Sequence, residues 1–276
     1  MTTFDNKTVY ITGGSSGIGL AAGRQLASLG ADILLLARQN APLEKAKTIL
    51  EKARRTNRQT IKILNVDVGN HLQVNEKMEQ AVQSFGAPDI LINSAGINKY
   101  ADHFENITPE MFSEVMNVNV NGVRNVTQAL LDPMKEKKGH VVILSSAAAL
   151  FGMFGYSTYA TSKAALMGFA ESLRYELKPL GMPVTIIFPP EVDTPMNLDE
   201  AKTLPEQGKA MKRVAGTLTP AYVANVIVEA IAKKKYFVVP GRLTRFLYLL
   251  HRVTNGVLTR IVSDVVVKKA GKPKSM

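Results

Sequence analysis

The chain has 276 residues, 46% of them hydrophobic and 21% charged, which is ordinary for a globular protein with one large or two small α/β domains. It contains no cysteine, which excludes disulfides, zinc–thiolate sites and thiol nucleophiles, and its four histidines are scattered, so we expect no metal site. The net charge of +11 is concentrated at one end, because residues 233–276 hold eleven Lys or Arg and one acid, Asp264. Such an asymmetry suggests an anionic surface as partner.

Short apolar segments alternate with longer segments of helical length along most of the chain. The apolar segments, which we predict as strands, are 8–12, 32–37, 61–66, 89–93, 140–145, 184–188 and 236–240. The longer segments, which we predict as crossover helices, are 17–29, 40–56, 70–85, 109–136, 157–178 and 219–234. Because continuously apolar strands are typical of parallel sheets covered by helices, the sequence predicts a doubly wound α/β sheet of about seven strands.

The domain organisation and location follow from the same pattern. The N-terminus enters the first predicted strand without a basic and then apolar leader, so we expect a cytoplasmic protein. No linker or shift in composition divides the chain before about residue 195. We therefore expect one domain over 1–240, and a basic amphipathic extension of the same domain over 241–276.

The first predicted strand leads into a glycine-rich turn, TGGSSGIG at 12–19, and then into the first helix. Gly13, Gly17 and Gly19 would let backbone N–H groups approach a pyrophosphate, to which the helix N-terminus adds its partial positive charge. A tight turn without a ligand is the alternative. The position between strand and helix favours dinucleotide binding.

The second predicted strand ends at Ala37 and Arg38, where dinucleotide-binding folds meet the adenosine ribose. A carboxylate there would bind the 2′-hydroxyl of NAD, whereas an arginine can pair with the 2′-phosphate of NADP. We therefore expect NADP(H). The alternative is a solvated arginine at the end of a strand.

Tyr159 and Lys163 are four residues apart in the predicted helix 157–178. Their side chains therefore lie on one helix face, one turn apart. This spacing alone fits an ordinary surface pair at least as well as a catalytic pair, so the rest of the chain must decide.

Several motifs, in one order, resemble those of the short-chain dehydrogenase/reductase family over about residues 5–240. They are TGGSSGIG at 12–19, DV at 67–68, NSAG at 93–96, NVNG at 119–122, SS at 145–146, YATSK at 159–163 and PPEVDTP at 189–195. Ser94 and Pro190 depart from the family's NNAG and PGxVxT patterns. The resemblance implies a Rossmann-type fold and hydride transfer between a nicotinamide and a carbonyl or alcohol carbon.

The resemblance also implies a role for each matched residue. Tyr159 would be the general acid of ketone reduction, and Lys163 would lower its pKa and bind the nicotinamide ribose. Ser146, thirteen residues before Tyr159 as in the family, would hold the substrate oxygen, and Asn119 would order a water in a proton relay. The residues expected to bind NADP(H) are Gly13, Ser15, Ser16, Gly17, Ile18, Gly19, Arg38, Asp67, Val68, Asn93, Ala95, Gly96, Tyr159, Lys163, Pro189, Val192 and Thr194.

Two segments near the predicted site bear on the substrate. The segment 147–157, between Ser146 and Tyr159, is rich in apolar side chains, which indicates an apolar cleft or, for some of them, core packing. Residues 196–218 resemble a mobile lid over the site. We therefore expect a lipophilic ketone as the substrate.

The C-terminal tail is apolar but interrupted by Arg245, His251, Arg252, Arg260 and Asp264, and no run approaches the ~20 apolar residues of a transmembrane helix. This pattern fits an interfacial helix on an anionic membrane, which would place the protein peripherally on a cytosolic membrane face. The alternative is a helical arm that packs on its own domain or on a partner subunit. We expect no nucleic acid partner, because no motif accompanies the charge. The resemblance implies a homodimer or homotetramer.

Within the family, PPEVDTP, GMFGYSTYATSK and the tail most resemble 3-ketodihydrosphingosine reductases, which reduce the ketone of a long-chain sphingoid base with NADPH. We therefore expect this reaction, a step of sphingolipid biosynthesis. The alternatives are a steroid or other lipid-alcohol dehydrogenase, a 3-oxoacyl-thioester reductase, and a non-catalytic NADP(H)-binding sensor or scaffold. The intact set of Asn119, Ser146, Tyr159 and Lys163 argues against the scaffold.

Overall fold

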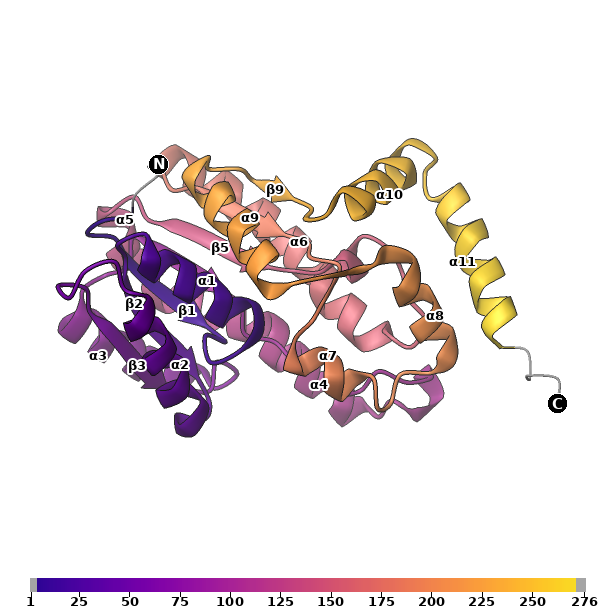
Figure 1. Cartoon of the computed structure of the whole chain (residues 1–276), viewed down its shortest axis with the longest axis horizontal. Helices are drawn as coiled ribbons and strands as arrows, with labels where there is room; N and C mark the ends of the chain where they lie inside the picture. The colour runs from indigo at the N-terminus through magenta and orange to yellow at the C-terminus, as the bar shows by residue number, and fades with distance from the viewer. Residues whose placement is uncertain (1–3, 272–276) are drawn as a thin grey trace.

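The computed structural model describes residues 4–271, and a seven-stranded parallel sheet forms its centre (Figure 1). The strands in spatial order are β3 (Ile61–Asn65), β2 (Asp32–Ala37), β1 (Thr8–Thr12), β4 (Ile90–Asn93), β5 (His140–Leu144), β6 (Val184–Ile187) and β9 (Phe237–Val238). Every neighbouring pair in this sheet is parallel. The strand order reverses between β1 and β4, and a ligand crevice forms at such a switch point, beyond the carboxyl ends of the strands.

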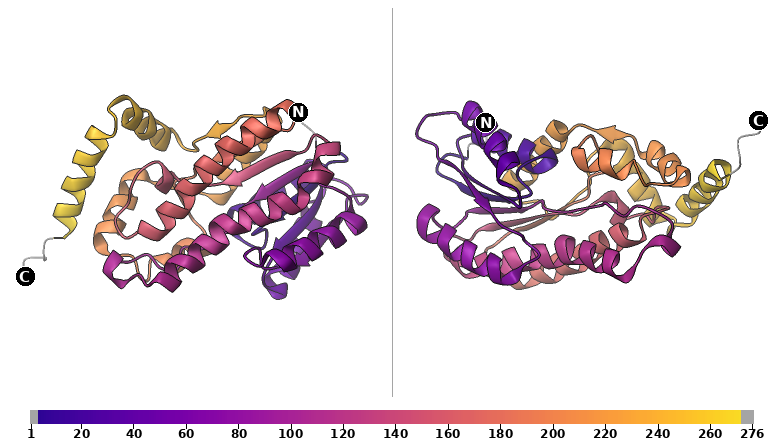
Figure 2. Two further views of the ribbon diagram at one scale, coloured as in Figure 1. Left: turned by 180° about the vertical axis from the view of Figure 1, so that it is seen from behind. Right: turned by 90° about the horizontal axis from the view of Figure 1, so that it is seen from below.

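Helices cover both faces of the sheet, which lies between them in the right panel of Figure 2. The helices on one face are α1 (Gly17–Ser28), α2 (Asn40–Ala53) and α9 (Pro220–Ala232). The helices on the other face are α3 (His71–Phe85), α5 (Gly122–Glu136) and α6 (Ser157–Leu177). The predicted doubly wound sheet and its crossover helices are confirmed.

Burial on both faces explains why the strands are continuously apolar. In β2, Ile33 and Leu35 pack into the core under α1, α2 and α9. The alternate residues Leu34 and Leu36 pack into the core under α3, α5 and α6. Since successive side chains of a strand point to opposite faces, each core needs its own apolar set.

Local sequence determines where several helices begin. Asn70 caps the start of α3, and its side chain accepts a hydrogen bond from the Gln73 N–H at 3.1 Å. Thr108 caps α4 (Pro109–Met116), and Thr219 caps α9, each followed by a proline at the first helical position. These are the residue types that satisfy unpaired N–H groups at a helix start.

One predicted helix differs in the structure. The segment 109–136 forms α4, then a π-helical turn, η2 (Asn117–Asn121), and then α5. A π turn inserts one residue into the helical repeat and is frequent at functional sites. This π turn contains Asn119, which the NVNG motif predicts as a site residue.

Several shorter elements follow the carboxyl ends of β5 and β6. They are η3 (Ala147–Ala149), β7 (Glu191–Val192), α7 (Pro195–Glu200), α8 (Glu206–Ala215) and β8 (Thr217–Leu218), with β7 and β8 paired in parallel. The tail forms α10 (Arg242–Val253) and α11 (Val257–Ala270), and α11 packs against α8 and α10. The short helices η1 (Phe104–Asn106) and η4 (Lys178–Leu180) lie in other connections. Within residues 4–271, no helix is both long and apolar enough to cross a bilayer.

Candidate active site

The four residues expected to perform the chemistry come from three elements that meet beyond β4 and β5. Ser146 directly follows β5, and Asn119 lies in the π turn η2. Tyr159 and Lys163 lie in the first two turns of α6. A Cβ on Gly96 would lie only 3.2 Å from Asn119 Oδ1 and 3.3 Å from Lys163 Nζ, so both polar groups reach the same backbone position.

The two adjacent serines have different partners. The buried Ser145 hydroxyl donates a hydrogen bond to the Lys163 carbonyl oxygen at 2.8 Å, which ties β5 to α6. The Ser146 hydroxyl accepts from the Ala148 N–H at 3.2 Å and shares a hydrogen bond with Tyr159. Ser146 is therefore the serine that faces the tyrosine, as the sequence spacing predicts.

Asn119 and Lys163 are both buried and held by backbone groups. Asn119 Nδ2 donates to the Ile97 carbonyl and to Ser162 Oγ, both at 3.0 Å, while its Oδ1 accepts from the Ile97 N–H at 2.8 Å. Lys163 Nζ donates to the Leu144 carbonyl at 3.0 Å and lies 5.6 Å from the centre of the Tyr159 ring. Burial lowers the pKa of Lys163 to about 8.

The pKa of Tyr159 moves opposite to the expectation from sequence. Burial raises it, the hydrogen bond with Ser146 lowers it, and the negative charge of Glu200 raises it again, so the net direction is upward. The net direction is upward because the buried phenol loses its hydration, and this outweighs any lowering by the Lys163 ammonium, which donates to the Leu144 carbonyl. Tyr159 is therefore protonated at neutral pH.

Gly13 and Gly19 of the glycine-rich turn have no room for a side chain. A Cβ on Gly13, where φ is +65°, would lie 2.8 Å from the Ala95 backbone, and one on Gly19 would lie 2.5 Å from the Gly13 carbonyl oxygen. In the described part of the chain, the Ser16 side chain does not cap α1, and the first turn holds no acidic residue. A close-approach turn at an uncapped helix start fits the pyrophosphate of a dinucleotide.

The residues expected around the adenosine lie past the ends of β2, β3 and β4. Arg38 is exposed after β2, and the half-buried Asp67 after β3 accepts from the Gly69 N–H at 3.0 Å. Asn93 is buried, with Nδ2 donating to Thr127 Oγ1 at 3.1 Å, and its Oδ1 has no hydrogen-bond partner among residues 4–271. Ala95 N–H donates to Thr12 Oγ1 at 3.1 Å, which holds the start of the NSAG segment against β1.

The segment after β6 returns to the glycine-rich turn. The Pro189 carbonyl accepts from the Ala147 N–H at 2.8 Å, so this segment is fixed beside Ser146. A Cβ on Gly17 would lie 3.1 Å from the Thr194 methyl group. Ile18, Pro189, Val192 and Thr194 all line one cavity, where the resemblance places the nicotinamide.

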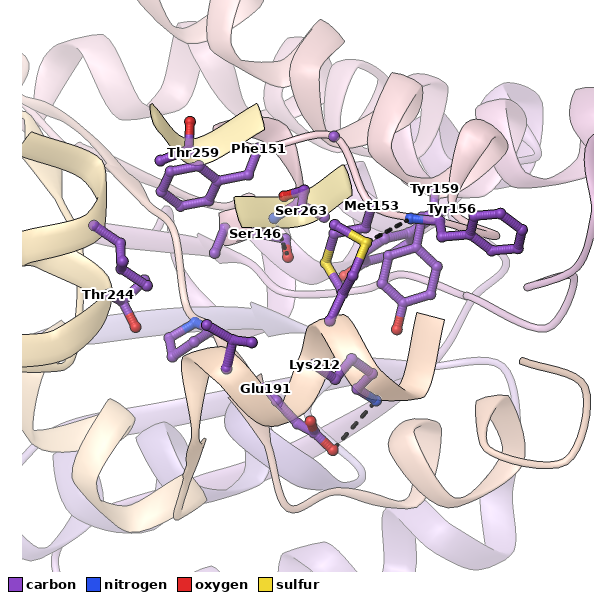
Figure 3. A pocket seen from close by; sticks show the side chains of 18 of the residues that line it. Ser146, Phe151, Met153, Tyr156, Tyr159, Glu191, Lys212, Thr244, Thr259 and Ser263 are labelled. Carbon is purple, nitrogen blue, oxygen red and sulfur yellow. Dashed lines mark hydrogen bonds and ion pairs between the residues drawn. The ribbon is translucent and has the colours of Figure 1, made fainter. Parts of the chain in front are cut away.

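This cavity has a volume of about 740 Å³ and connects the site to the tail (Figure 3). Ser146 and Tyr159 line it together with apolar side chains from the segment 147–157, from α7 and α8, and from the tail. These apolar residues are Phe151, Met153, Phe154, Met196, Met211, Val214, Leu247, Leu250, Leu258 and Val262. The cleft is apolar, as predicted, and the inner side of the tail is one of its walls.

One group of lining residues escaped the sequence analysis. Lys212 Nζ of α8 lies 2.6 Å from Glu200 Oε1 and 3.2 Å from Glu191 Oε1. Glu200 also accepts hydrogen bonds from Asn98 Nδ2, at 2.7 Å, and from the Tyr156 hydroxyl. Glu191 is part of the PPEVDTP motif, but nothing in the polar sequence around Glu200 and Lys212 signals that they are buried.

Comparison with known proteins places the chain among oxidoreductases. The model of the short chain dehydrogenase family matches residues 7–205. A relative named 3-dehydrosphinganine reductase, from Danio rerio, is 37% identical over 223 residues, which are 80% of this chain and 67% of that protein.

Two solved structures share the fold. Levodione reductase has a TM-score of 0.78 and 26% sequence identity, over 86% of this chain and 96% of its own. An alcohol dehydrogenase from the archaeon Thermococcus sibiricus, complexed with 5-hydroxy-NADP, has a TM-score of 0.72 and 26% identity, over 84% of this chain and 95% of its own. Both likenesses extend well beyond the residues that the family model matches.

Proposed function

The chain belongs to the short-chain dehydrogenase/reductase family, and from this premise we propose that it reduces 3-ketodihydrosphingosine to dihydrosphingosine with NADPH, in sphingolipid biosynthesis. Family membership makes it an oxidoreductase with a nicotinamide cofactor that acts on a ketone or alcohol. The observation that carries the choice of substrate is the apolar cavity, which joins Ser146 and Tyr159 to the walls formed by α10 and α11. A long alkyl chain beside the ketone would fill such a cavity.

The proposed mechanism assigns each polar group one task. When bound, the reduced nicotinamide supplies the hydride that reaches the carbonyl carbon. Ser146 Oγ donates a hydrogen bond to the carbonyl oxygen and holds it beside Tyr159. As negative charge develops on that oxygen, the Tyr159 hydroxyl, which is protonated at neutral pH, gives it a proton.

Lys163 and Asn119 then restore the proton on Tyr159. The Lys163 ammonium, near the tyrosine ring, stabilises the phenolate that remains after proton transfer. Asn119, fixed by Ile97 and Ser162, orders a water that connects Lys163 to solvent. The relay rests on the positions of these groups and on their roles in the family.

The preference for NADPH over NADH is part of the proposal. Support comes from Arg38, which is exposed at the end of β2 where a dinucleotide presents its ribose 2′ position. A guanidinium at that place pairs with a 2′-phosphate. The glycine-rich turn, Asp67, Val68, Asn93, Ala95 and Gly96 would bind the rest of the dinucleotide.

We propose that the tail docks on an anionic membrane through its outer face, which would place the protein on a cytosolic membrane surface. The inner side of the tail lines the cavity, and the outer side leaves several large apolar side chains exposed. They are Leu243, Phe246, Leu249, Val253, Val257, Ile261 and Val265. Exposed arginines and lysines accompany them, which is the composition of an interfacial helix.

The proposal also includes a domain boundary and an oligomeric state. We propose a domain over 1–240 with an extension over 241–276. Because α10 and α11 line the cavity, removal of this extension should open it to solvent. Its last residues, 272–276, lie outside the described part. A homodimer or homotetramer is expected from the family, and light scattering of the purified protein measures it.

The test of the proposed function compares substrates for one enzyme. Purified protein with NADPH should reduce 3-ketodihydrosphingosine with a kcat/KM at least about 100-fold above that for steroid ketones or 3-oxoacyl thioesters. A higher kcat/KM for a steroid ketone would show that the enzyme is a steroid dehydrogenase and that the proposed substrate is wrong. NADPH binding without turnover of any ketone would favour a sensor or scaffold.

A further inference from the structure

An excess of negative charge lies inside the otherwise apolar cavity. Glu191 and Glu200 face the single ammonium of Lys212, and the three side chains are only 20%, 7% and 10% exposed. Figure 3 shows Glu191 and Lys212 in the same pocket as Ser146, Tyr156 and Tyr159. Two carboxylates against one ammonium leave one negative charge without compensation, and burying such a charge is costly.

Glu200 and Lys212 form the compensated part of this cluster. Their closest atoms are 2.6 Å apart, whereas Glu191 lies at 3.2 Å from the same ammonium. Asn98 and the Tyr156 hydroxyl also hold Glu200. Glu200 is therefore fixed in place by neighbours on three other segments and has little acceptor capacity left for a ligand.

Glu191 is the more exposed carboxylate and is rigidly placed. It follows Pro189 and Pro190 and lies in β7, where it pairs with Thr217 of β8. Asn197 Nδ2 donates to its Oε1 at 2.6 Å, which orients the carboxylate. The adjoining Val192 and Thr194 line the same cavity, so Glu191 is close to the expected position of the reacting carbonyl.

We propose that Glu191 binds the substrate's ammonium group, so that the enzyme selects α-amino ketones over neutral ketones. The inference rests on the proposed function, since 3-ketodihydrosphingosine carries an amino group on the carbon next to its ketone. At neutral pH this group is an ammonium, and it supplies the positive charge that the cluster lacks. Glu200 and Lys212 are positioning residues that hold α7 and α8 around Glu191.

A second carboxylate also lines the cavity and is the competing site. Asp264 lies on α11, where it is exposed, and Arg260 from the same helix lines the cavity with it. Water screens an exposed carboxylate, which weakens its selectivity for an ammonium relative to a partly buried one. The structure therefore favours Glu191 over Asp264.

The experiment compares Glu191→Gln with wild type on two short-chain ketones, an α-amino ketone and the same ketone without the amino group. The kcat/KM for the amino ketone should fall about 10- to 100-fold, as expected for loss of one charge-assisted contact, while that for the neutral ketone should change less than about twofold. Asp199→Asn is the matched control, because Asp199 of α7 forms an exposed ion pair with Lys202, just after this helix. It should change neither value.

Product binding separates this inference from the proposed function. Calorimetry of the protein with NADP⁺ should show that Glu191→Gln weakens binding of a short-chain dihydrosphingosine about tenfold or more, and leaves its neutral N-acetyl derivative unaffected. This readout holds whether or not the ketone is turned over. The proposal would be overturned if Glu191→Gln weakened binding of the charged and the neutral ligand equally, or weakened neither. It would also be overturned if only a second variant, Asp264→Asn, selectively weakened binding of the charged ligand.

Discussion

At the residue scale, the site depends on a buried tyrosine that is protonated at neutral pH. Its hydroxyl shares a hydrogen bond with Ser146, and the buried ammonium of Lys163 lies beside its ring. This arrangement suits proton donation to a reduced carbonyl, because the donor must hold its proton until the oxygen gains negative charge. Burial is a property of the whole fold, which is why the sequence alone suggested a lowered pKa.

The first prediction removes that proton. Tyr159→Phe should lower kcat by about 10²–10⁴-fold, the range for loss of a general acid, since the phenol is the only group assigned to this step. NADPH binding, measured by fluorescence titration, should stay within about twofold of wild type. Turnover close to the wild-type rate would show that another group supplies the proton.

The second prediction concerns the adenosine end of the cofactor. Arg38→Asp should lower the ratio of kcat/KM for NADPH to that for NADH by at least about tenfold, because a carboxylate repels the 2′-phosphate and accepts from a 2′-hydroxyl. Arg58→Asp, at an exposed arginine before β3, is the control for the change in charge alone. An unchanged ratio would remove the 2′-phosphate role from Arg38.

The site was predictable to the extent that its residues follow local motifs. Ser146, Tyr159 and Lys163 are separated by fixed spacings, and the glycine-rich turn lies between a strand and a helix, so neighbouring residues identify them. Glu200 and Lys212 lie in a polar segment that resembles a solvated lid. Glu200 is buried against Asn98 and Tyr156, which lie 102 and 44 residues earlier in the chain, and Lys212 pairs with Glu200. No local pattern encodes these contacts.

At the element scale, the strand β5 carries a buried histidine at its start. His140 Nε2 lies 2.7 Å from Thr185 Oγ1 in β6, and the Thr185 hydroxyl donates its own proton to the Lys235 carbonyl at 2.7 Å. His140 must therefore donate to Thr185 from Nε2. Burial, with a smaller effect of the Lys234 charge, lowers the pKa of His140 to about 4.

The third prediction follows from that pKa. Unfolded His140 titrates near pH 6.5, so between pH 6.5 and 4 the unfolded chain binds a proton that the folded chain does not. This contribution to stability is complete above about pH 6.5 and is lost as the pH falls towards 4, with an upper limit of about 3 kcal/mol. His140→Gln, which keeps one donor, should lose less free energy of unfolding between pH 7.5 and 5 than wild type. Equal losses in urea titrations would contradict this origin.

The helices and strands themselves show which elements a sequence can reveal. The strands were found because both faces of the sheet are covered, which makes each strand continuously apolar. The segment 109–136 reads as one helix, and the π turn at Asn117–Asn121 is invisible because it changes backbone register without changing the apolar pattern. Its location was found only through the motif that contains Asn119.

At the scale of the whole molecule, the basic tail has two faces with different surroundings. One face closes the cavity next to the site, and α11 also packs on α8. The other face is exposed, with Phe246 at 61% and Ile261 at 53% of their full accessible surface. The sequence left open whether the tail packs on its own domain, because that contact joins segments far apart along the chain. In the structure α11 packs against α8, while the outer face of the tail stays exposed and is the face proposed to bind the membrane.

The fourth prediction tests that outer face. Replacing Phe246 and Ile261 together by serine should lower binding to vesicles that contain anionic lipid by about tenfold or more, because burial of large apolar side chains in the interface is lost. Sedimentation with vesicles measures it. Phe104→Ser, at a phenylalanine outside the tail that is at least as exposed as Phe246, should leave binding unchanged. Undiminished binding by the double variant would mean that the tail is not the docking surface.

The proposed function requires that this chain transfer a hydride to the ketone of a sphingoid base. Its most direct test incubates the purified protein with 3-ketodihydrosphingosine and NADPH deuterated at the nicotinamide C4 position, followed by mass spectrometry of the lipid. We expect dihydrosphingosine that carries one deuterium on the carbon of the former ketone. Unreacted ketone, under conditions in which the protein binds NADPH, would contradict it.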